Sequence, residues 1–210
     1  MIRVLIADDH EFVRKGLRNF LEGECGINVV AEASNCLEVI DVLRENYVDV
    51  AVIDISMPGG SGLDVLQQIK KYRPNLPVLF LTMHSENRFA VRALKSGAAG
   101  YITKESAPKE LVKAIRKVVR GGTYVSEHLA EMLAYGLHSK DAKPIHETLS
   151  NREYQIMLLI AKGESIKGIA CGLSISAGTV YTHRERILEK MRMRTNVEIA
   201  HYAVLNGLVD

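Results

Sequence analysis

Five polar residues come at, or directly after, short apolar runs that resemble β-strands: Asp8, Asp9, Asp54, Thr82 and Lys104. Carboxylates supply a nucleophile and oxygen ligands for a hard divalent cation. A hydroxyl donates hydrogen bonds, and an ammonium on a flexible stem can reach a phosphoryl oxygen. Together these groups are what phosphoryl transfer to an aspartate requires, so the pattern predicts that chemistry wherever the fold gathers the five residues.

Three carboxylates in one place are electrostatically unfavourable. Two carboxylates about 4 Å apart repel each other by roughly 4 kcal/mol at an effective dielectric constant near 20. A divalent cation with oxygen ligands relieves this repulsion, and we expect Mg²⁺. Taken singly, each Asp is more typical of a helix cap and the Lys of a solvated side chain. Five such residues at the ends of consecutive strands favour the functional interpretation.

The elements that must position these residues alternate strictly up to about residue 120. The expected strands are 2–7, 29–33, 48–53, 78–81 and 100–103. Between them, helical periodicity runs near 12–21, 37–45, 63–72, 88–96 and 108–120. This alternation predicts an α/β fold, a five-stranded, doubly wound parallel sheet of the flavodoxin-like type. In such sheets binding residues gather at the carboxyl ends of the strands.

Residues 1–120 resemble the receiver domains of two-component response regulators. The residues that carry the resemblance are Asp8-Asp9, Asp54, Met57-Pro58, Gly62, Thr82 and Lys104, in order and position. The resemblance implies that Asp54 accepts a phosphoryl group from a sensor histidine kinase. It implies that Mg²⁺ is held by Asp8, Asp9, Asp54 and the carbonyl of Ser56. It also implies that Lys104 stabilises the phosphoryl group and that Thr82 and Tyr101 form a switch pair.

A different pattern follows the first segment. Gly121-Gly122 ends its last helix, and we expect a linker over residues 121–147 with a short helix near 127–137. From 148 to 210 the sequence shows helical periodicity only, near 152–161, 166–172, 177–191 and 196–206. A short helix, a tight turn and a longer helix predict a small all-α domain with a helix-turn-helix.

The longer helix, 177–191, has two distinct faces. Its inward stripe is expected to be Val180, Ile187, Leu188 and Met191. Its outer face is expected to hold Tyr181, Thr182, Glu185, Arg186 and Glu189. Basic side chains in its second half could pair with phosphates while shorter groups near its start read base edges. Charge alone would indicate only a solvated surface.

The order of residues in this domain favours DNA binding. The domain resembles the LuxR type through Leu149-Ser150, Arg152-Glu153, Gly163, Ile169-Ala170, Thr179-Val180, His183 and Lys190-Met191. With the receiver, it resembles the NarL/FixJ subfamily of bacterial transcriptional regulators. The resemblance implies that double-stranded DNA bases face Tyr181, Thr182 and Glu185. It implies that phosphates lie near Lys167, Thr179, Arg186 and Lys190.

Two of these positions depart from the family pattern, which often has Lys where Tyr181 stands and a basic or neutral residue where Glu185 stands. We therefore expect an altered operator preference. Glu185 either accepts a hydrogen bond from a cytosine amine or pairs with Lys190 or Arg186. His183 matches the family, and beside the inward stripe it is interpreted as a packing or capping residue.

Composition bears on nucleic-acid binding, on the cellular compartment and on membrane segments. The net charge of +2 among 210 residues is too small to indicate nucleic-acid binding by itself. The cysteines Cys25, Cys36 and Cys171 show no C-x-x-C spacing and are interpreted as reduced core thiols of a cytoplasmic protein. The sequence contains no apolar run long enough for a signal peptide or a membrane span.

The alternative functions are a phosphatase, a nucleotide-binding domain and a receiver that acts only through protein partners. A phosphatase resembling the haloacid dehalogenases would carry a second Asp two positions after Asp54, where Ser56 stands. We therefore expect no enzyme, and at most slow self-hydrolysis of a long-lived phosphoaspartate. A nucleotide-binding domain would need a glycine-rich loop after the first strand, and the sequence has none there. A receiver acting only through protein partners stays open.

The favoured mechanism is a two-state switch that forms a homodimer when phosphorylated or bound to DNA.

Overall fold

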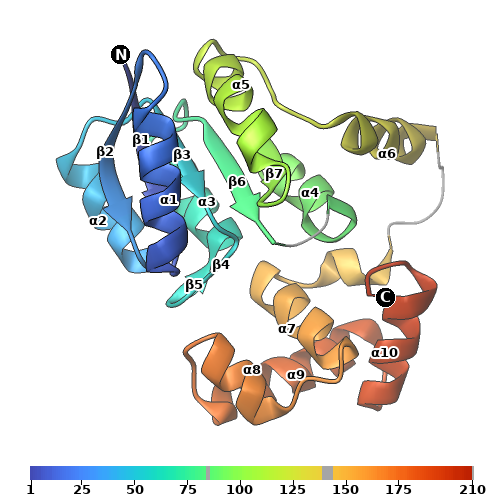
Figure 1. Cartoon of the computed structure of the whole chain (residues 1–210). Coiled ribbons are helices and arrows are strands. Elements are labelled where there is room, and N and C mark those ends of the chain that lie inside the picture. The colour runs from blue at the N-terminus through green and yellow to red at the C-terminus, as the bar shows by residue number, and fades with distance from the viewer. Residues whose placement is uncertain (84–85, 139–143, 210) are drawn as a thin grey trace. The chain divides into compact units, whose positions relative to one another are not determined.

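The computed structural model describes residues 1–83, 86–138 and 144–209. The chain forms two compact units, Met1–Gly136 and Leu137–Asp210 (Figure 1). The first unit contains the sheet, and in the described residues of the second every regular element is a helix.

The first unit is built on a parallel sheet of five strands, which confirms the predicted fold class. The strands are β1 (Ile2–Ala7), β2 (Ile27–Ala33), β3 (Val50–Ile53), β6 (Val78–Thr82) and β7 (Gly100–Thr103). Their order in the sheet is β2-β1-β3-β6-β7, with every neighbouring pair parallel. The order reverses between β1 and β3, so the carboxyl ends of these two strands border the crevice where open α/β sheets bind ligands.

Three strand boundaries differ from prediction, and one of them is the end of β6, at Thr82 rather than at residue 81. β2 begins at Ile27 rather than at residue 29, because Ile27 pairs with Ile2 in the parallel ladder. β3 begins at Val50 rather than at residue 48. The residue before it, Asp49, holds Arg3 through a hydrogen bond from the Arg3 backbone N–H at 2.8 Å and others from its guanidinium at 3.1 Å.

A small antiparallel pair of strands was not predicted. It consists of β4 (Ser56–Met57) and β5 (Gly60–Ser61), joined through Pro58 and Gly59. Gly59 has φ of 83°, a conformation that suits glycine. Strands of two residues are too short to show a period of two, which is why the sequence did not reveal them.

Six helices belong mainly to this unit: α1 (Glu11–Glu22), α2 (Cys36–Glu45), α3 (Gly62–Tyr72), α4 (Glu86–Lys95), α5 (Ala107–Val119) and α6 (Glu127–His138). The first five lie within a residue or two of their predicted spans. Side chains cap three of them: Asn35 accepts hydrogen bonds from the backbone of Leu37 and Glu38, Ser61 accepts one from Leu63, and Ser126 accepts one from Leu129. Such caps satisfy backbone donors that have no partner within the helix.

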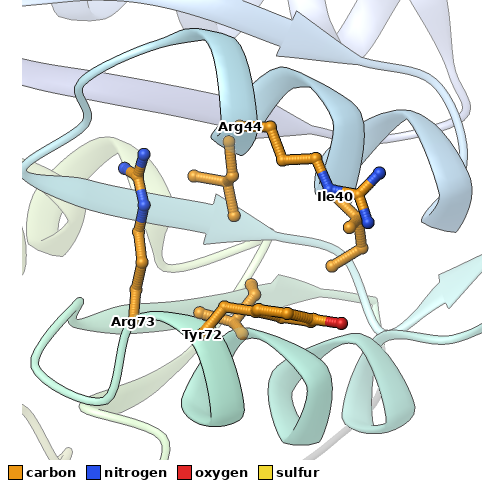
Figure 2. Close-up of a pocket in the computed structure, with 6 residues that line it drawn as sticks. Ile40, Arg44, Tyr72 and Arg73 are labelled. Carbon is orange, nitrogen blue, oxygen red and sulfur yellow. The ribbon is translucent and has the colours of Figure 1, made fainter.

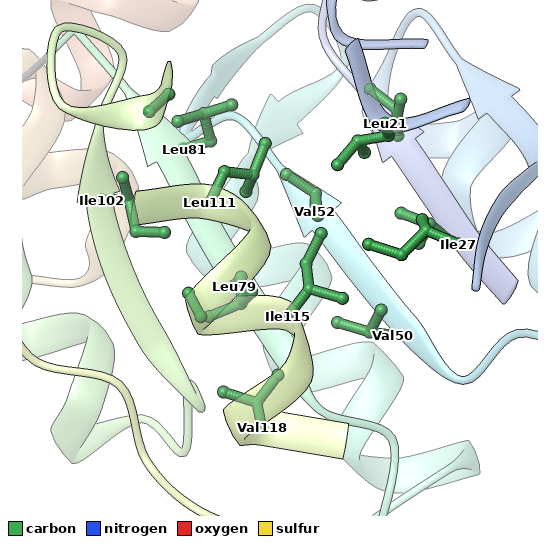
Figure 3. Packing of buried hydrophobic residues seen from close by; sticks show 14 of the residues in the cluster. Leu21, Ile27, Val50, Val52, Leu79, Leu81, Ile102, Leu111, Ile115 and Val118 are labelled. Atoms are coloured by element: carbon green, nitrogen blue, oxygen red, sulfur yellow. The ribbon is translucent and has the colours of Figure 1, made fainter. Parts of the chain in front are cut away.

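Helix α5 packs on one face of the sheet. Figure 3 shows Leu111, Ile115 and Val118 of α5 lying over side chains from the strands, among them Val52 and Leu79. Leu21 at the end of α1 joins the same cluster. All residues of β3 and β6 are buried, as expected for strands covered by helices on both faces.

The chain beyond α5 stays attached to the sheet. Tyr124 donates its backbone N–H to the carbonyl of Ala99 at 2.7 Å and forms an isolated parallel bridge with Gly100 at the edge of β7. A Cβ at Gly100 would lie 2.7 Å from the Tyr124 carbonyl oxygen, so this approach requires glycine. Leu129 in α6 is fully buried.

The second unit is a bundle of short helices. It comprises the 3-10 helix η1 (Ile145–Thr148), α7 (Asn151–Ala161), α8 (Ile166–Gly172), α9 (Ala177–Met191) and α10 (Asn196–Leu205). Helix α7 packs against α9 and α10, and α8 packs against α9. The four α-helices match their predicted spans to within one residue, whereas η1 was not predicted. Among the described helices, none combines the length and apolar character needed to cross a membrane.

The three cysteines are free, as predicted, but only one is a core residue. Cys36 is buried at the start of α2. Cys25, in the turn after α1, and Cys171, on α8, are exposed. The prediction of core thiols is therefore wrong for these two, because neither lies on the apolar face of its segment.

A small hollow of about 110 Å³ lies between α2 and α3. Figure 2 shows Arg73 on one side of it, Ile40 and Arg44 on the other, and Tyr72 at the bottom of the view. Arg44 and Tyr72 lie in the last turns of α2 and α3, and Arg73 directly follows α3. Helices that connect parallel strands run antiparallel to them, so the hollow lies toward the amino ends of the strands and is separate from the acidic residues.

Candidate functional site

The sheet ladder carries two of the predicted aspartates to one edge. Asp8 directly follows β1 and Asp54 directly follows β3, the strand next to it. The Asp54 backbone N–H donates to Ala7 at 2.8 Å, and that of Asp8 donates to Ala33 at 3.1 Å. Because the ladder continues past the ends of the strands, both carboxylates project from ordered backbone at the carboxyl edge.

Lys104 joins these two carboxylates. Its backbone N–H donates to the Thr82 carbonyl at 2.8 Å, which holds it just beyond β7. Its Nζ lies 2.6 Å from Asp8 Oδ2 and 2.6 Å from Asp54 Oδ2. The sequence analysis assigned the relief of this repulsion to a divalent cation. In the structure the protein's own ammonium also lies between two of the acids.

Burial and neighbouring charges change the pKa values of both Asp54 and Lys104. Burial raises the pKa of the Asp54 carboxyl, an effect that the Lys104 ammonium opposes and that the neighbouring Asp8 reinforces. For Lys104, burial alone would lower the pKa, but Asp54 and Asp8 outweigh it and the pKa is raised. Lys104 therefore stays cationic, while Asp54 is a more basic carboxylate than a solvated one and hence a better nucleophile.

Asp9 lies at the rim of the site with a neighbour that the sequence analysis missed. The His10 Nδ1 is 2.9 Å from Asp9 Oδ1 and 3.3 Å from Asp8 Oδ1. The potential ligand atoms of these three residues all lie within 4.8 Å of one another. The signal that could have revealed His10 is its place directly after the two aspartates, at the N-cap of α1.

The donor set at this edge suits a hard cation. Three carboxylates are present, and Ser56 is held near them because its backbone N–H donates to Asp54 Oδ1 at 3.2 Å. Carboxylate and carbonyl oxygens are the ligands that Mg²⁺ prefers in proteins. On the chemistry of its donors, the site fits the predicted ion.

Thr82 and Tyr101 lie on neighbouring strands and on the same face of the sheet. Tyr101 of β7 pairs in register with Phe80 of β6, and Thr82 is two residues beyond Phe80. Residues two apart on a strand share a face, as do residues paired across strands. Both side chains are buried, Thr82 at 1% exposure and Tyr101 at 0%. Their placement is compatible with the predicted switch pair.

The second unit contains the predicted helix-turn-helix. Helix α8 ends at Gly172 and α9 begins after Ser176, whose side chain accepts a hydrogen bond from the Thr179 backbone at 3.0 Å. Ser174, within the turn, has φ of 52°. The predicted inward stripe of α9 is buried in full: Val180, Ile187, Leu188 and Met191.

The residues predicted to face DNA are all exposed: Lys167, Thr179, Tyr181, Thr182, Glu185, Arg186 and Lys190. Four of them already have partners in the protein, and one is Thr179, whose hydroxyl oxygen lies 2.8 Å from that of Ser176. Thr182 Oγ1 donates to the Gly178 carbonyl at 3.1 Å, and Lys190 Nζ lies 2.6 Å from Glu153 Oε2. Glu185 pairs with Arg184 at 2.7 Å, not with the two basic residues that sequence reasoning had offered as its partners.

His183 lies beside the buried stripe, as predicted. Its Nδ1 is buried and has no hydrogen-bond partner among the described residues. Burial lowers the pKa of this imidazole, and the positive charge of Arg152 lowers it further. His183 is therefore a packing residue of α9, because a neutral ring is what this environment favours.

Comparisons with known proteins agree with this geometry. Residues 4–116 match the model of the response regulator receiver domain, and residues 147–203 match that of the bacterial regulatory proteins of the luxR family. The chain is 39% identical over 211 residues to the response regulator UvrY of Escherichia coli, covering 100% of this chain and 97% of UvrY. It is 37% identical to the response regulator GacA of Pseudomonas aeruginosa, covering 100% of this chain and 99% of GacA.

Solved structures give the same picture. The RcsB response regulator of Salmonella typhimurium matches with a TM-score of 0.70 at 27% identity, covering 100% of this chain and 98% of RcsB. RcsB bound to the promoter rprA in the presence of the phosphomimetic BeF3⁻ matches with a TM-score of 0.67 at 28% identity, over 96% of this chain and 97% of that one. Since both family models and full-length relatives cover the two units, the chain belongs to the response regulators of the NarL/FixJ type, transcriptional regulators that join a receiver to a LuxR-type DNA-binding domain.

Proposed function

We propose that Asp54 is the phosphoacceptor through which a sensor histidine kinase controls DNA binding by this protein. A carboxylate oxygen of Asp54 attacks the phosphorus of a phosphohistidine, a P–O bond forms, and the P–N bond to the histidine breaks. The observation that carries the proposal is the Lys104 ammonium 2.6 Å from Asp54, at the edge where Asp8 also lies. There it can neutralise charge on the incoming phosphoryl group.

The other residues of the edge have supporting roles. Asp8, Asp9 and Asp54, with the carbonyl of Ser56, would hold Mg²⁺, which supplies charge neutralisation for the phosphoryl oxygens. Thr82 would donate its hydroxyl to the phosphoryl group, and Tyr101 would respond behind it. Their shared face of β6 and β7 supports this pairing. No second carboxylate stands at position 56, so we expect a long-lived phosphoaspartate with at most slow self-hydrolysis and no turnover as an enzyme.

The two predicted domains would have different roles. Residues 1–120 would act as the receiver and 148–210 as the DNA-binding domain, with 121–147 as the linker. We expect a homodimer when the protein is phosphorylated or bound to DNA, since paired recognition helices engage two half-sites. RcsB, a structural relative, has been solved as dimers bound to DNA. Free cysteines and a kinase partner support a cytoplasmic location.

The central test compares wild type with Asp54→Asn. DNA affinity is measured with and without a small-molecule phosphodonor and Mg²⁺. We expect the phosphodonor to tighten binding by wild type and to leave the variant unchanged, because an amide oxygen cannot form the acyl phosphate. An equal response in both proteins would exclude Asp54 as the trigger.

The recognition surface is tested separately. We propose that Tyr181, Thr182 and Glu185 face bases, and that phosphates lie near Lys167, Thr179, Arg186 and Lys190. Replacing Arg186 with Ala should lower the slope of log K against log salt by about 0.9, the contribution of one phosphate contact. An unchanged slope would remove Arg186 from the phosphate-contacting set.

A further inference from the structure

Two consecutive residues of α7 contact the end of the recognition helix α9 and the turn that precedes it. Glu153 reaches Lys190 in the last turn of α9, and Arg152 reaches Leu173, which ends α8. In the sequence these residues are recognisable only as a helix cap and as part of the family pattern. Their three-dimensional contacts indicate a further role.

The first contact is a charge-assisted hydrogen bond. Glu153 Oε2 accepts from Lys190 Nζ at 2.6 Å and from the Ser150 backbone N–H at 2.8 Å. The Glu153 side chain is 4% exposed and that of Lys190 is 41% exposed. Burial alone would raise the pKa of Glu153, but Lys190 and Ser150 outweigh it and the pKa is lowered. The carboxylate is therefore ionised at neutral pH and holds the lysine by full charge.

The second contact lies in the turn between α8 and α9. Arg152 donates from one guanidinium nitrogen to the Leu173 carbonyl at 3.1 Å and from another to Gln155 Oε1 at 2.8 Å. Leu173 is the C-cap of α8 and directly precedes Ser174, which has a left-handed backbone conformation. The planar guanidinium thus ties the first turn of α7 to the turn of the helix-turn-helix.

We infer that Arg152 and Glu153 are positioning residues for DNA recognition, which fix the turn before α9 and the last turn of α9 without touching DNA. The inference rests on the proposed function, in which α9 enters the major groove. An ammonium has three donors, so Lys190 can keep Glu153 with one and offer the other two to a phosphate. Glu153 then orients the Lys190 ammonium toward the phosphate. Arg152 fixes the position of the turn from which α9 begins.

Electrostatics alone predicts the opposite effect of Glu153. DNA is a polyanion, so removing a carboxylate near the binding surface should tighten binding. If Glu153 acts by positioning, removing its charge should weaken binding. The sign of the change therefore separates the two explanations.

The test uses Glu153→Gln in the full-length protein. The Gln amide oxygen can still accept from Ser150, so the cap of α7 is retained while the ion pair with Lys190 is lost. We expect specific DNA to be bound about fivefold more weakly. The matched control is Glu189→Gln, the same charge change at an exposed position of α9, which should leave affinity unchanged or slightly tighter. Circular dichroism and thermal melting of each variant establish that it is folded.

A double-mutant cycle then tests the coupling. Lys190→Met removes the ammonium and keeps the stem, and Glu153→Gln should have no further effect in that background. Lys190→Arg, which can still pair with Glu153, should restore affinity to within about twofold of wild type. Arg152→Ala should weaken specific binding several-fold and leave non-specific binding nearly unchanged, since it removes no phosphate contact.

The outcomes separate this inference from the function it rests on. If wild type shows no specific DNA binding, the proposed function fails. If wild type binds and Glu153→Gln behaves like Glu189→Gln, the function stands and the positioning role is overturned. Additive effects of Glu153→Gln and Lys190→Met would overturn the coupling in the same way.

Discussion

At the scale of single residues, Lys104 explains how buried aspartates coexist at the edge of the sheet. Its ammonium contacts Asp8 and Asp54 at the same distance of 2.6 Å. One cation cannot compensate two buried carboxylates in full, and the raised pKa of Asp54 reflects the remainder together with its burial. Asp54 is thus held in an environment that disfavours its negative charge.

This environment predicts a pH-dependent gain in stability for Asp54→Asn. Because the pKa of Asp54 is raised on folding, its protonated form stabilises the fold below the unfolded pKa of about 4, and this contribution is lost as pH rises through the raised value. Asn resembles the protonated form at every pH. We expect the variant to be more stable than wild type at pH 7 and equal to it near pH 4. Urea unfolding in EDTA measures both.

Asp49→Asn is the control of opposite sign. Hydrogen bonds from Arg3 lower the pKa of Asp49. Its carboxylate therefore stabilises the fold above the unfolded pKa, and this contribution is lost as pH falls through the lowered value. The variant should lose stability at pH 7, with a difference that shrinks at acid pH. Equal gains for Asp54→Asn at pH 4 and 7 would show that charge burial is not the cause.

At the scale of elements, Gly62 allows α3 to begin directly behind Asp54. A Cβ there would lie 2.5 Å from the Asp54 carbonyl oxygen and 2.9 Å from Ile55 Cα. Backbone cannot yield as a flexible side chain can, so Gly62→Ala should destabilise the protein by about 2–3 kcal/mol. Gly16→Ala is the matched control, because no atom lies within 4 Å of its Cβ position and α1 surrounds it. It should stabilise by about 0.5–1 kcal/mol in the same unfolding assay.

The turn of the helix-turn-helix stores a small strain. Ser174 has φ of 52°, which costs a residue with a Cβ more than it costs glycine. Ser174→Gly should therefore stabilise the protein by up to about 1 kcal/mol. Two residues later, Ser176→Ala should destabilise by about 1 kcal/mol, because the Ser176 side chain caps α9. Loss of stability in Ser174→Gly, measured by thermal unfolding, would contradict the strain.

At the scale of the whole molecule, the first compact unit extends beyond the last helix of the predicted receiver, through Gly136. Tyr124 pairs with the edge of β7, and Leu129 is fully buried. A fragment ending at residue 138 should therefore be more stable than one ending at residue 120, by about 2–4 kcal/mol for the lost burial and edge pairing. Urea midpoints of the two fragments measure this. Equal midpoints would show that the segment after α5 adds nothing to the fold.

Much of the fold could be predicted because its signals are local. The bounds of β1, β7, α8 and α9 agree with prediction, since each has a clear apolar period and a clear cap or turn. β4, β5 and η1 were missed, because a strand of two residues and a single 3-10 turn carry no hydrophobic period. Exposure of Cys25 and Cys171 was also missed, since a lone thiol does not reveal which face of its segment it occupies.

The sequence by itself determined the alternation of strands and helices, and with it the edge at which Asp8, Asp54, Thr82 and Lys104 meet. Only the tertiary structure decided which of these groups touch. Lys104 and Asp54 are 50 positions apart, and Lys190 and Glu153 are 37 apart. Periodicity reports the face on which a residue lies. The distance between two side chains depends on how separate elements pack, and the linear order of residues does not contain that distance.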